Sequence, residues 1–261
     1  MGETKKTDVV VVGAGPVGLV AGLALKEKGI SSVVIEAEPY GRPRAGSRAI
    51  YLHNATLKLL EETSKGLGFT LARNGIIWPV KRTLYKGKQV YVRNYGVTDN
   101  KDPHHLPHFT SLHQHEIEKY LYEACVHAGV EFVWGEPVQT MDISKSGVRL
   151  VTENGNVWEA EYVIGCDGAR SVVREQAGLR FEGPRTADTF IVVDVKEDPD
   201  NPLPLERTFH YQHPAMGGRN VMFVPFKDGW RIDLQLLSSD KPEDYMGVEN
   251  VKKMDAESDG P

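Results

Sequence analysis

The sequence predicts an α/β protein in which a parallel sheet with helices is followed by an antiparallel sheet. Three observations support this fold class. The first 36 residues are patterned as strand, tight turn, helix and second strand, which is a βαβ unit. A later strand, Val157 to Ile164, ends in another glycine-containing turn. Past Gly183-Pro184 the pattern changes to short alternating strands with polar turns between them, as in an antiparallel sheet.

The βαβ unit begins with Asp8 to Val12, a run of β-branched and apolar residues. A glycine-rich turn follows, and Leu19 to Lys28 then has helical periodicity that ends at Gly29. Ser32 to Ile35 is a second apolar run. These elements predict two parallel strands joined by a right-handed helical crossover.

The middle of the chain predicts further helices and strands. The predicted helices cover Asn54–Glu62 and Glu116–Ala128, a β-hairpin covers Gly75–Tyr95 around Lys86-Gly87-Lys88, and strands cover Glu131–Trp134 and Val148–Val151. The later strands are Phe190–Val195, Thr208–His210, Val221–Pro225 and Trp230–Leu237. We therefore expect a first domain at 1–186 with a hairpin excursion at about 75–110, a partial β-sheet domain at 187–240, and a disordered tail at 241–261.

Composition narrows the class of protein. The 261 residues are 40% hydrophobic and 26% charged, which is sufficient to form a globular core, and the net charge is −5. A mildly acidic chain has no electrostatic reason to bind nucleic acid or an anionic membrane, so we expect small-molecule partners. The polar N-terminus shows no signal peptide or membrane span. Cys125 and Cys166 fit reduced thiols, and a cytosolic (cytoplasmic) location is expected.

The glycine-rich turn has the spacing of a dinucleotide site. Gly13 permits the tight turn, Gly15 lets the backbone approach a pyrophosphate, and Gly18 lets helix and strand pack closely. Glu36 follows 18 positions after Gly18, where a carboxylate can accept hydrogen bonds from ribose hydroxyls. The residues expected to contact the cofactor here are Gly13, Ala14, Gly15, Pro16, Val17, Gly18, Glu36 and Ala37.

A second glycine motif, running from Gly165 to Arg174 as GCDGARSVVR, follows the strand at 157–164. Asp167 and Gly168 lie at the strand end, and Ser171 is placed to cap the next helix. Taken singly, this motif is also consistent with an ordinary turn. With both motifs in order, the chain resembles the flavoprotein monooxygenases of the p-hydroxybenzoate hydroxylase type, whose pattern is GxGxxG followed much later by CDGxxSxxR.

The resemblance implies a Rossmann-like FAD-binding domain, an antiparallel substrate domain, and several cofactor contacts. Asp167 and Gly168 would contact the ribityl and diphosphate region of FAD and help to receive NAD(P)H, with Arg170 and Arg174 as weaker matches. Arg48, before Ala49, matches an FAD-contacting Arg-Ala pair, and Arg44-Ala45 is a competing match. Gln114 matches a residue that hydrogen-bonds near the flavin diphosphate.

The activity implied by the resemblance is hydroxylation of a phenolic or polyketide-like aromatic substrate. NAD(P)H would reduce FAD, and O2 would form a flavin hydroperoxide that transfers oxygen to the ring. No catalytic side chain is singled out. The alternatives are an epoxidase, a halogenase, whose Trp-x-Trp-x-Ile-Pro motif is absent, or a non-catalytic FAD-binding fragment or subunit. No segment after Leu237 resembles the family's third FAD fingerprint, so an incomplete chain or a second polypeptide is also expected.

Two side-chain groups invite other interpretations. A histidine cluster lacks the cysteines or the HExxH spacing of metal sites, so no metal is predicted. Its members are His104, His105, His108, His113 and His115. A set of aromatic residues is consistent with either a substrate pocket or ordinary packing. These are Tyr51, His53, His210, Tyr211 and Trp230.

Overall fold

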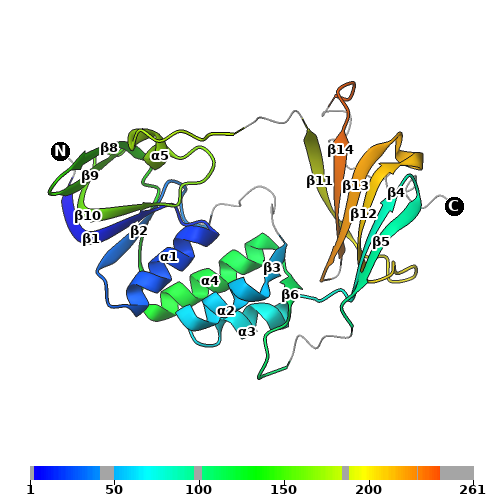
Figure 1. The fold of residues 1–261 in the computed structure, drawn as a ribbon. Helices are drawn as coiled ribbons and strands as arrows, with labels where there is room; N and C mark the ends of the chain where they lie inside the picture. The colour runs from blue at the N-terminus through cyan, green and yellow to red at the C-terminus, as the bar shows by residue number, and fades with distance from the viewer. Residues whose placement is uncertain (1–2, 42–49, 97–101, 184–187, 228, 242–261) are drawn as a thin grey trace. The chain divides into compact units, whose positions relative to one another are not determined.

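The computed structural model describes residues 3–41, 50–96, 102–183, 188–227 and 229–241 (Figure 1). The chain divides into two compact units, each built around its own six-stranded sheet. The first unit comprises Met1–Ala49, His53–Leu71 and His113–Gly183, and the second comprises Ile50–Leu52, Ala72–Leu112 and Pro184–Pro261. The tail predicted to be disordered lies outside the described residues apart from its first residue.

The first sheet has the order β7-β2-β1-β10-β9-β8. Its strands are β1 (Thr4–Val12), β2 (Ser32–Glu36), β7 (Glu131–Trp134), β8 (Val138–Ser144), β9 (Gly147–Thr152) and β10 (Val157–Gly165). The first four in the spatial order run parallel, whereas β9 and β8 continue the sheet as antiparallel strands. Val12 pairs with both Ile35 and Gly165, so β2, β1 and β10 end in line.

The helices in the described residues are α1 (Pro16–Glu27), α2 (Asn54–Thr63), α3 (Leu67–Asn74), α4 (Gln114–Ala128) and α5 (Val172–Gln176). Helices α1 and α4 pack against each other (Figure 1). Gly22 of α1 allows close packing on the sheet, because a Cβ there would lie 2.6 Å from Cγ2 of Val34. Gly129 ends α4 in the left-handed conformation, with φ of 76°.

The fold class predicted from the sequence is confirmed, with differences in detail. The structure has every predicted strand and helix of the first unit, and α4 begins at Gln114 instead of Glu116. Strand β8 and helix α3 were not predicted. In β8 only Val138 and Met141 are buried, so the strand lacks the regular apolar alternation that identifies a strand from its sequence.

The second sheet has the order β11-β14-β13-β12-β4-β5. Its strands are β4 (Val80–Tyr85), β5 (Lys88–Asn94), β11 (Thr189–Lys196), β12 (Glu206–His213), β13 (Arg219–Phe226) and β14 (Gly229–Leu236). A short 3-10 turn covers Pro214–Met216, and β3 (Tyr51–His53) pairs with β6 (Phe109–Ser111). All neighbours in this sheet are antiparallel except β12 and β4, which are parallel.

The predicted hairpin forms, and Lys86 and Gly87 both have the positive φ of its tight turn. The sequence-based division places about 75–110 within the first domain, whereas the structure groups residues 72–112 with the second unit. The physical reason is the pairing of β4 with β12, supported by a bidentate ion pair at 2.8 Å between Arg82 and Glu206. That contact joins residues 124 positions apart, beyond the reach of a local pattern.

A small apolar cluster packs on one face of the second sheet. It contains buried Met216, Val221 and Leu234, with Phe223 and Ile232 packed against it. His210 pairs with Val221 across β12 and β13, and its ring lies 5.9 Å from that of Phe223. The Nδ1 atom of His210 is buried without a hydrogen-bond partner among the described residues. This imidazole therefore favours the neutral form.

We expect acid to destabilise the second unit through His210. Burial, and then the neighbouring His213, lower the pKa of His210 from 6.5 to about 4. Because the folded pKa lies below the unfolded one, the contribution of His210 is constant above pH 6.5 and is lost as the pH falls from 6.5 to about 4. Urea unfolding at several pH values measures this loss of unfolding free energy. Between pH 6.5 and about 4 the loss should be about 1–2 kcal/mol smaller in His210→Phe than in the wild type. Exposed His104→Phe is the control, and a His210→Phe profile parallel to the wild type would contradict the expectation.

Candidate nucleotide-binding site

Three neighbouring strands carry the sequence motifs to one edge of the first sheet. Strands β2, β1 and β10 are adjacent and parallel, and Val12 at the end of β1 pairs with Ile35 of β2 and Gly165 of β10. Glu36 ends β2, Gly13 follows β1, and Asp167 follows the end of β10. The carboxyl edge of a parallel sheet is where nucleotides bind in open α/β folds. The structure thus brings the two sequence motifs together.

The glycine turn is sterically restricted to glycine at two positions. Gly13 has φ of +101°, its N–H donates to the Ile35 carbonyl at 2.7 Å, and a Cβ there would lie 2.6 Å from the Cys166 carbonyl oxygen. A Cβ on Gly18 would lie 1.8 Å from the Gly13 carbonyl oxygen. Both obstructing atoms belong to the backbone. The first glycine is therefore needed for the turn, and Gly18 for the close return of the helix.

The beginning of α1 is suited to a phosphate group. Gly15 occupies the N-cap position, Pro16 follows it, and no described side chain caps the helix. The first turn contains no acidic residue, and Val17 is 69% exposed. Backbone N–H groups at an uncapped helix N-terminus, together with the helix dipole, favour an anion. These residues fit the pyrophosphate of a dinucleotide.

Glu36 connects the end of β2 to the glycine turn. Its buried carboxylate accepts a hydrogen bond from the Ala14 N–H at 2.6 Å through Oε2 and one from the Glu38 N–H at 3.1 Å through Oε1. Ala37, between the two acids, is exposed. Glu36 therefore shapes the turn at the edge of the sheet where the nucleotide motif places a ribose.

The second motif forms a capped helix start. The Ser171 hydroxyl accepts from the Arg174 N–H at 2.9 Å, which confirms the predicted cap. Asp167 accepts from the Ser171 hydroxyl at 2.5 Å and from the Val173 N–H at 3.0 Å. Gly168 follows with φ of +80°. The Asp167 carboxylate thus holds the short helix α5 at the end of β10, next to the glycine turn.

The remaining sequence-predicted residues have different surroundings. Gln114 is the first residue of α4, and its Nε2 donates to Glu118 at 2.8 Å. Arg170 is exposed, and Arg174 donates to the Ala169 carbonyl at 3.0 Å with its guanidinium over the Phe181 ring. Arg48 and the competing Arg44 lie outside the described residues.

A pocket beside the glycine turn was not found from the sequence. It has a volume of about 330 Å³ and an aromatic wall in which the Tyr40 ring lies 5.4 Å from Trp134 and 5.8 Å from Tyr122. Burial and the neighbouring Tyr40 raise the pKa of Tyr122. The pairing of Glu36 with Trp134 in β7 places this wall next to the acid that ends β2. The complete lining is Ala14, Leu19, Glu38, Pro39, Tyr40, Gly41, His115, Glu118, Lys119, Tyr122 and Trp134.

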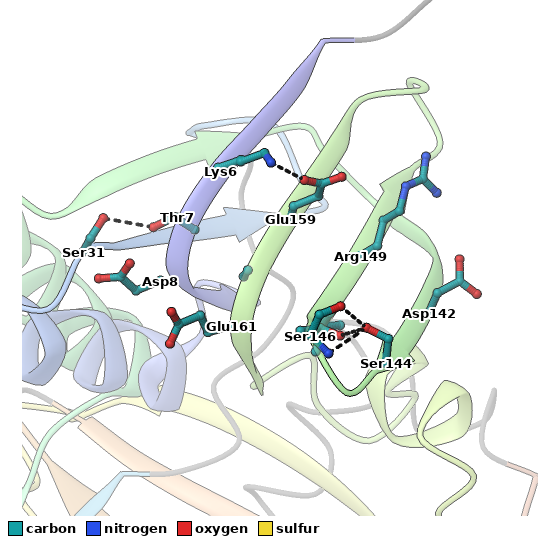
Figure 2. A pocket seen from close by; sticks show the side chains of 13 residues that line it. Lys6, Thr7, Asp8, Ser31, Asp142, Ser144, Ser146, Arg149, Glu159 and Glu161 are labelled. Carbon is teal, nitrogen blue, oxygen red and sulfur yellow. Dashed lines mark hydrogen bonds and ion pairs between the residues drawn. The ribbon is translucent and has the colours of Figure 1, made fainter.

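A larger pocket of about 670 Å³ is lined in part by Lys6, Thr7 and Asp8 of β1, whereas the glycine turn follows the last residue of that strand (Figure 2). Its lining contains positively charged, negatively charged and hydroxyl side chains. Among them is the exposed ion pair of Lys6 with Glu159 at 3.0 Å. Exposed pairs of this kind contribute little. In the described part of the chain, no group of three or more His, Cys, Asp or Glu residues is arranged to hold a metal ion. Among the same residues no helix is long and apolar enough to cross a membrane.

The fold and the site define a dinucleotide-binding protein of the two-motif flavoprotein class. The family model of the FAD binding domain matches residues 6–258, almost the whole chain. The chain belongs to this FAD-binding family, the flavoprotein monooxygenases of the p-hydroxybenzoate hydroxylase type, and FAD is the cofactor of the domain.

Individual relatives support the assignment. The chain is 32% identical over 239 residues to 6-methylpretetramide 4-monooxygenase of Streptomyces rimosus, covering 88% of this chain and 40% of the relative. It is 27% identical to dialkyldecalin synthase of Streptomyces rugosporus, covering 76% of this chain and 40% of the relative. The crystal structure of the flavin-dependent monooxygenase PieE with FAD and substrate has the same fold, with a TM-score of 0.81, 21% identity, and coverage of 97% of this chain and 47% of that chain. The chain thus spans about 40% of the length of these two curated relatives.

Proposed function

We propose that this protein is an FAD-dependent monooxygenase that hydroxylates an aromatic substrate with NAD(P)H and O2. The observation that carries the proposal is the common edge of β2, β1 and β10, where both FAD motifs meet. Membership of the FAD-binding family and the 32% identity to a monooxygenase support it. The activity is proposed for the protein as a whole, and the first unit would supply the nucleotide end of it.

The roles proposed for the chain's own residues follow from their surroundings. The uncapped start of α1 holds the pyrophosphate, and Glu36 accepts from the ribose next to it. The aromatic wall of Tyr40, Tyr122 and Trp134 offers flat apolar surface to the adenine ring. Asp167 holds α5 in place beside this edge, and Gly168 continues the turn. Contacts of Ala37, Gln114 and Arg48 with FAD stay predictions from the resemblance.

When bound, FAD supplies the redox chemistry, accepting electrons from NAD(P)H and delivering them to oxygen. The protein contributes binding, orientation and exclusion of water. A second polypeptide and a cytoplasmic location also stay predictions. Co-purification of the untagged native protein and fractionation of its source cells would test them.

An absorption spectrum of the purified chain tests the proposed function. After incubation with FAD and removal of excess cofactor, we expect oxidised flavin bands that bleach on anaerobic addition of NADPH. Turnover with a panel of phenols should then consume O2 and yield hydroxylated products. Loss of all flavin on desalting would contradict FAD binding by this chain. Bound flavin that NADPH and NADH both fail to bleach would instead favour a non-catalytic FAD-binding unit.

A further inference from the structure

One face of the second sheet carries a cation and an acid close to each other. Pairing aligns Phe209 of β12 with Met222 of β13, and Met222 with Asp233 of β14. Paired residues in antiparallel strands lie on the same face, so these three side chains form a row. Arg207 lies two residues before Phe209 and therefore on the same face. The sheet thus brings Arg207 and Asp233 together from strands that flank β13.

Arg207 has few hydrogen bonds for a guanidinium that is partly buried. In the part of the chain that the structure describes, its only hydrogen bond runs from Nη2 to Sδ of Met222 at 2.8 Å. A thioether is a weak acceptor, and the guanidinium has further N–H donors to offer. Burial lowers the pKa of Arg207, while Tyr51, Tyr95 and Asp233 act in the opposite direction. The group is therefore well suited to an anionic oxygen.

One carboxylate oxygen of Asp233 receives no hydrogen bond from the described residues. Its Oδ1 is buried, and no described residue donates a hydrogen bond to it. The nearby Arg231 is instead held by Asp194 through two bonds of 2.8 Å. Burial raises the pKa of Asp233 and Asp194 adds to this, while Arg231 and Arg207 lower it. A carboxylate in this position gains from taking up a proton.

An aromatic cluster contributed by the 50–52 and 72–112 segments lies beside Arg207. The Tyr51 ring stacks on Phe109 with centroids 4.8 Å apart, and Tyr95 lies 5.7 Å from the same Phe109. Burial raises the pKa of Tyr51, with Arg207 opposing the shift through its charge. The strand pairing places them close together, because Arg207 pairs with Lys81 of β4 and the Tyr95 N–H donates to the carbonyl of Pro79, just before β4. A planar aromatic ligand could pack on such rings while its polar group reaches the arginine.

We propose that Arg207 and Asp233 together bind the acidic hydroxyl of a phenolic substrate. The phenol O–H bond breaks, its proton forms a carboxylic acid with Asp233, and the phenolate oxygen accepts hydrogen bonds from Arg207. The total charge is unchanged, because a phenolate replaces the carboxylate opposite the arginine. Ionisation makes the ring more electron-rich and so more reactive toward an electrophilic oxygen. This inference deepens the proposed function and rests on it for the identity of the substrate class.

The test uses 4-nitrophenol, whose phenolate is yellow, with the purified FAD-incubated chain and no NAD(P)H. At a pH below the ionisation range of the free compound, the wild type should bind it with the phenolate band present and with no release of protons to a weakly buffered solution. Arg207→Met should lose the band and weaken binding at least about tenfold. Arg207→Lys, which retains the charge, should keep the band with weaker binding.

In Asp233→Asn the proton has no carboxylate to go to, so the phenolate band should form only with proton release to the solution. Exposed Lys196→Met removes a positive charge from the same sheet and is the matched control, with unchanged binding. The ligand 4-nitroanisole, which cannot ionise, should bind the wild type and the variants equally.

Three results would overturn the inference: no binding of 4-nitrophenol, bound ligand that stays neutral in the wild type, or an Arg207→Met variant that behaves as the wild type does. None of these measurements involves turnover. A phenolate band that depends on Arg207 in a chain that NAD(P)H cannot reduce would refute the proposed function and keep the binding site. Hydroxylation that is unchanged in Arg207→Met would keep the proposed function and refute the binding site at Arg207.

Discussion

Gly18→Ala is expected to lower the free energy of unfolding of the first unit by about 3 kcal/mol or more and to abolish FAD retention. A Cβ at this position would lie 1.8 Å from the Gly13 carbonyl oxygen and 2.9 Å from its carbon. Both are backbone atoms of the glycine turn, so relief requires that helix α1 move away from β1. That movement would displace the N–H groups proposed to hold the pyrophosphate. Urea unfolding and flavin absorbance after desalting measure the two effects.

Gly22→Ala is the matched control on the same helix. Its Cβ would lie 2.6 Å from Cγ2 of Val34 and 3.3 Å from Cγ1 of Val130, both at the far ends of side chains. Small rotations can relieve these contacts, and alanine has a higher helix propensity than glycine by about 1 kcal/mol. We expect a loss below about 2 kcal/mol with FAD retained. Equal stabilities of the two variants would refute the steric account of the turn.

Glu36→Ala is expected to weaken FAD binding at least about tenfold and to lower stability by about 1–3 kcal/mol. The substitution removes the acceptor of the buried Ala14 N–H and of the Glu38 N–H, and with it the acceptor proposed for the ribose. Glu36→Gln keeps a side-chain oxygen and should fall between the wild type and the alanine variant. Flavin fluorescence titration and thermal unfolding give the two quantities.

Glu27→Ala removes an exposed acid at the end of α1 and serves as the control. It should leave both quantities within experimental error of the wild type. If Glu36→Ala bound FAD as the wild type does while losing stability, Glu36 would have only its structural role in the turn. The proposed ribose contact would then be abandoned.

Much of the nucleotide edge could be predicted from the sequence because its determinants are local. Gly13 and Gly18 are required because a Cβ at either position would collide with nearby backbone atoms of the two motifs. Ser171 caps a helix that begins at the next residue. The alignment of the two motifs follows from the parallel strands that precede them. The aromatic wall of the pocket was missed, because Tyr40 and Trp134 meet only through the pairing of β2 with β7.

The sequence by itself determined the parallel strands with their crossover helix and the two motifs at the nucleotide edge of the sheet. Periodicity, turn chemistry and capping each depend on a few neighbouring residues, so they can be recognised in the sequence alone. Only the tertiary structure decided that the hairpin of β4 and β5 joins the second sheet, and that Arg207 and Asp233 share a face. The physical reason is that strand pairing joins residues far apart in sequence through backbone hydrogen bonds. Every residue type can accept such a bond and every type except proline can donate one, so the side chains do not identify the partner strand.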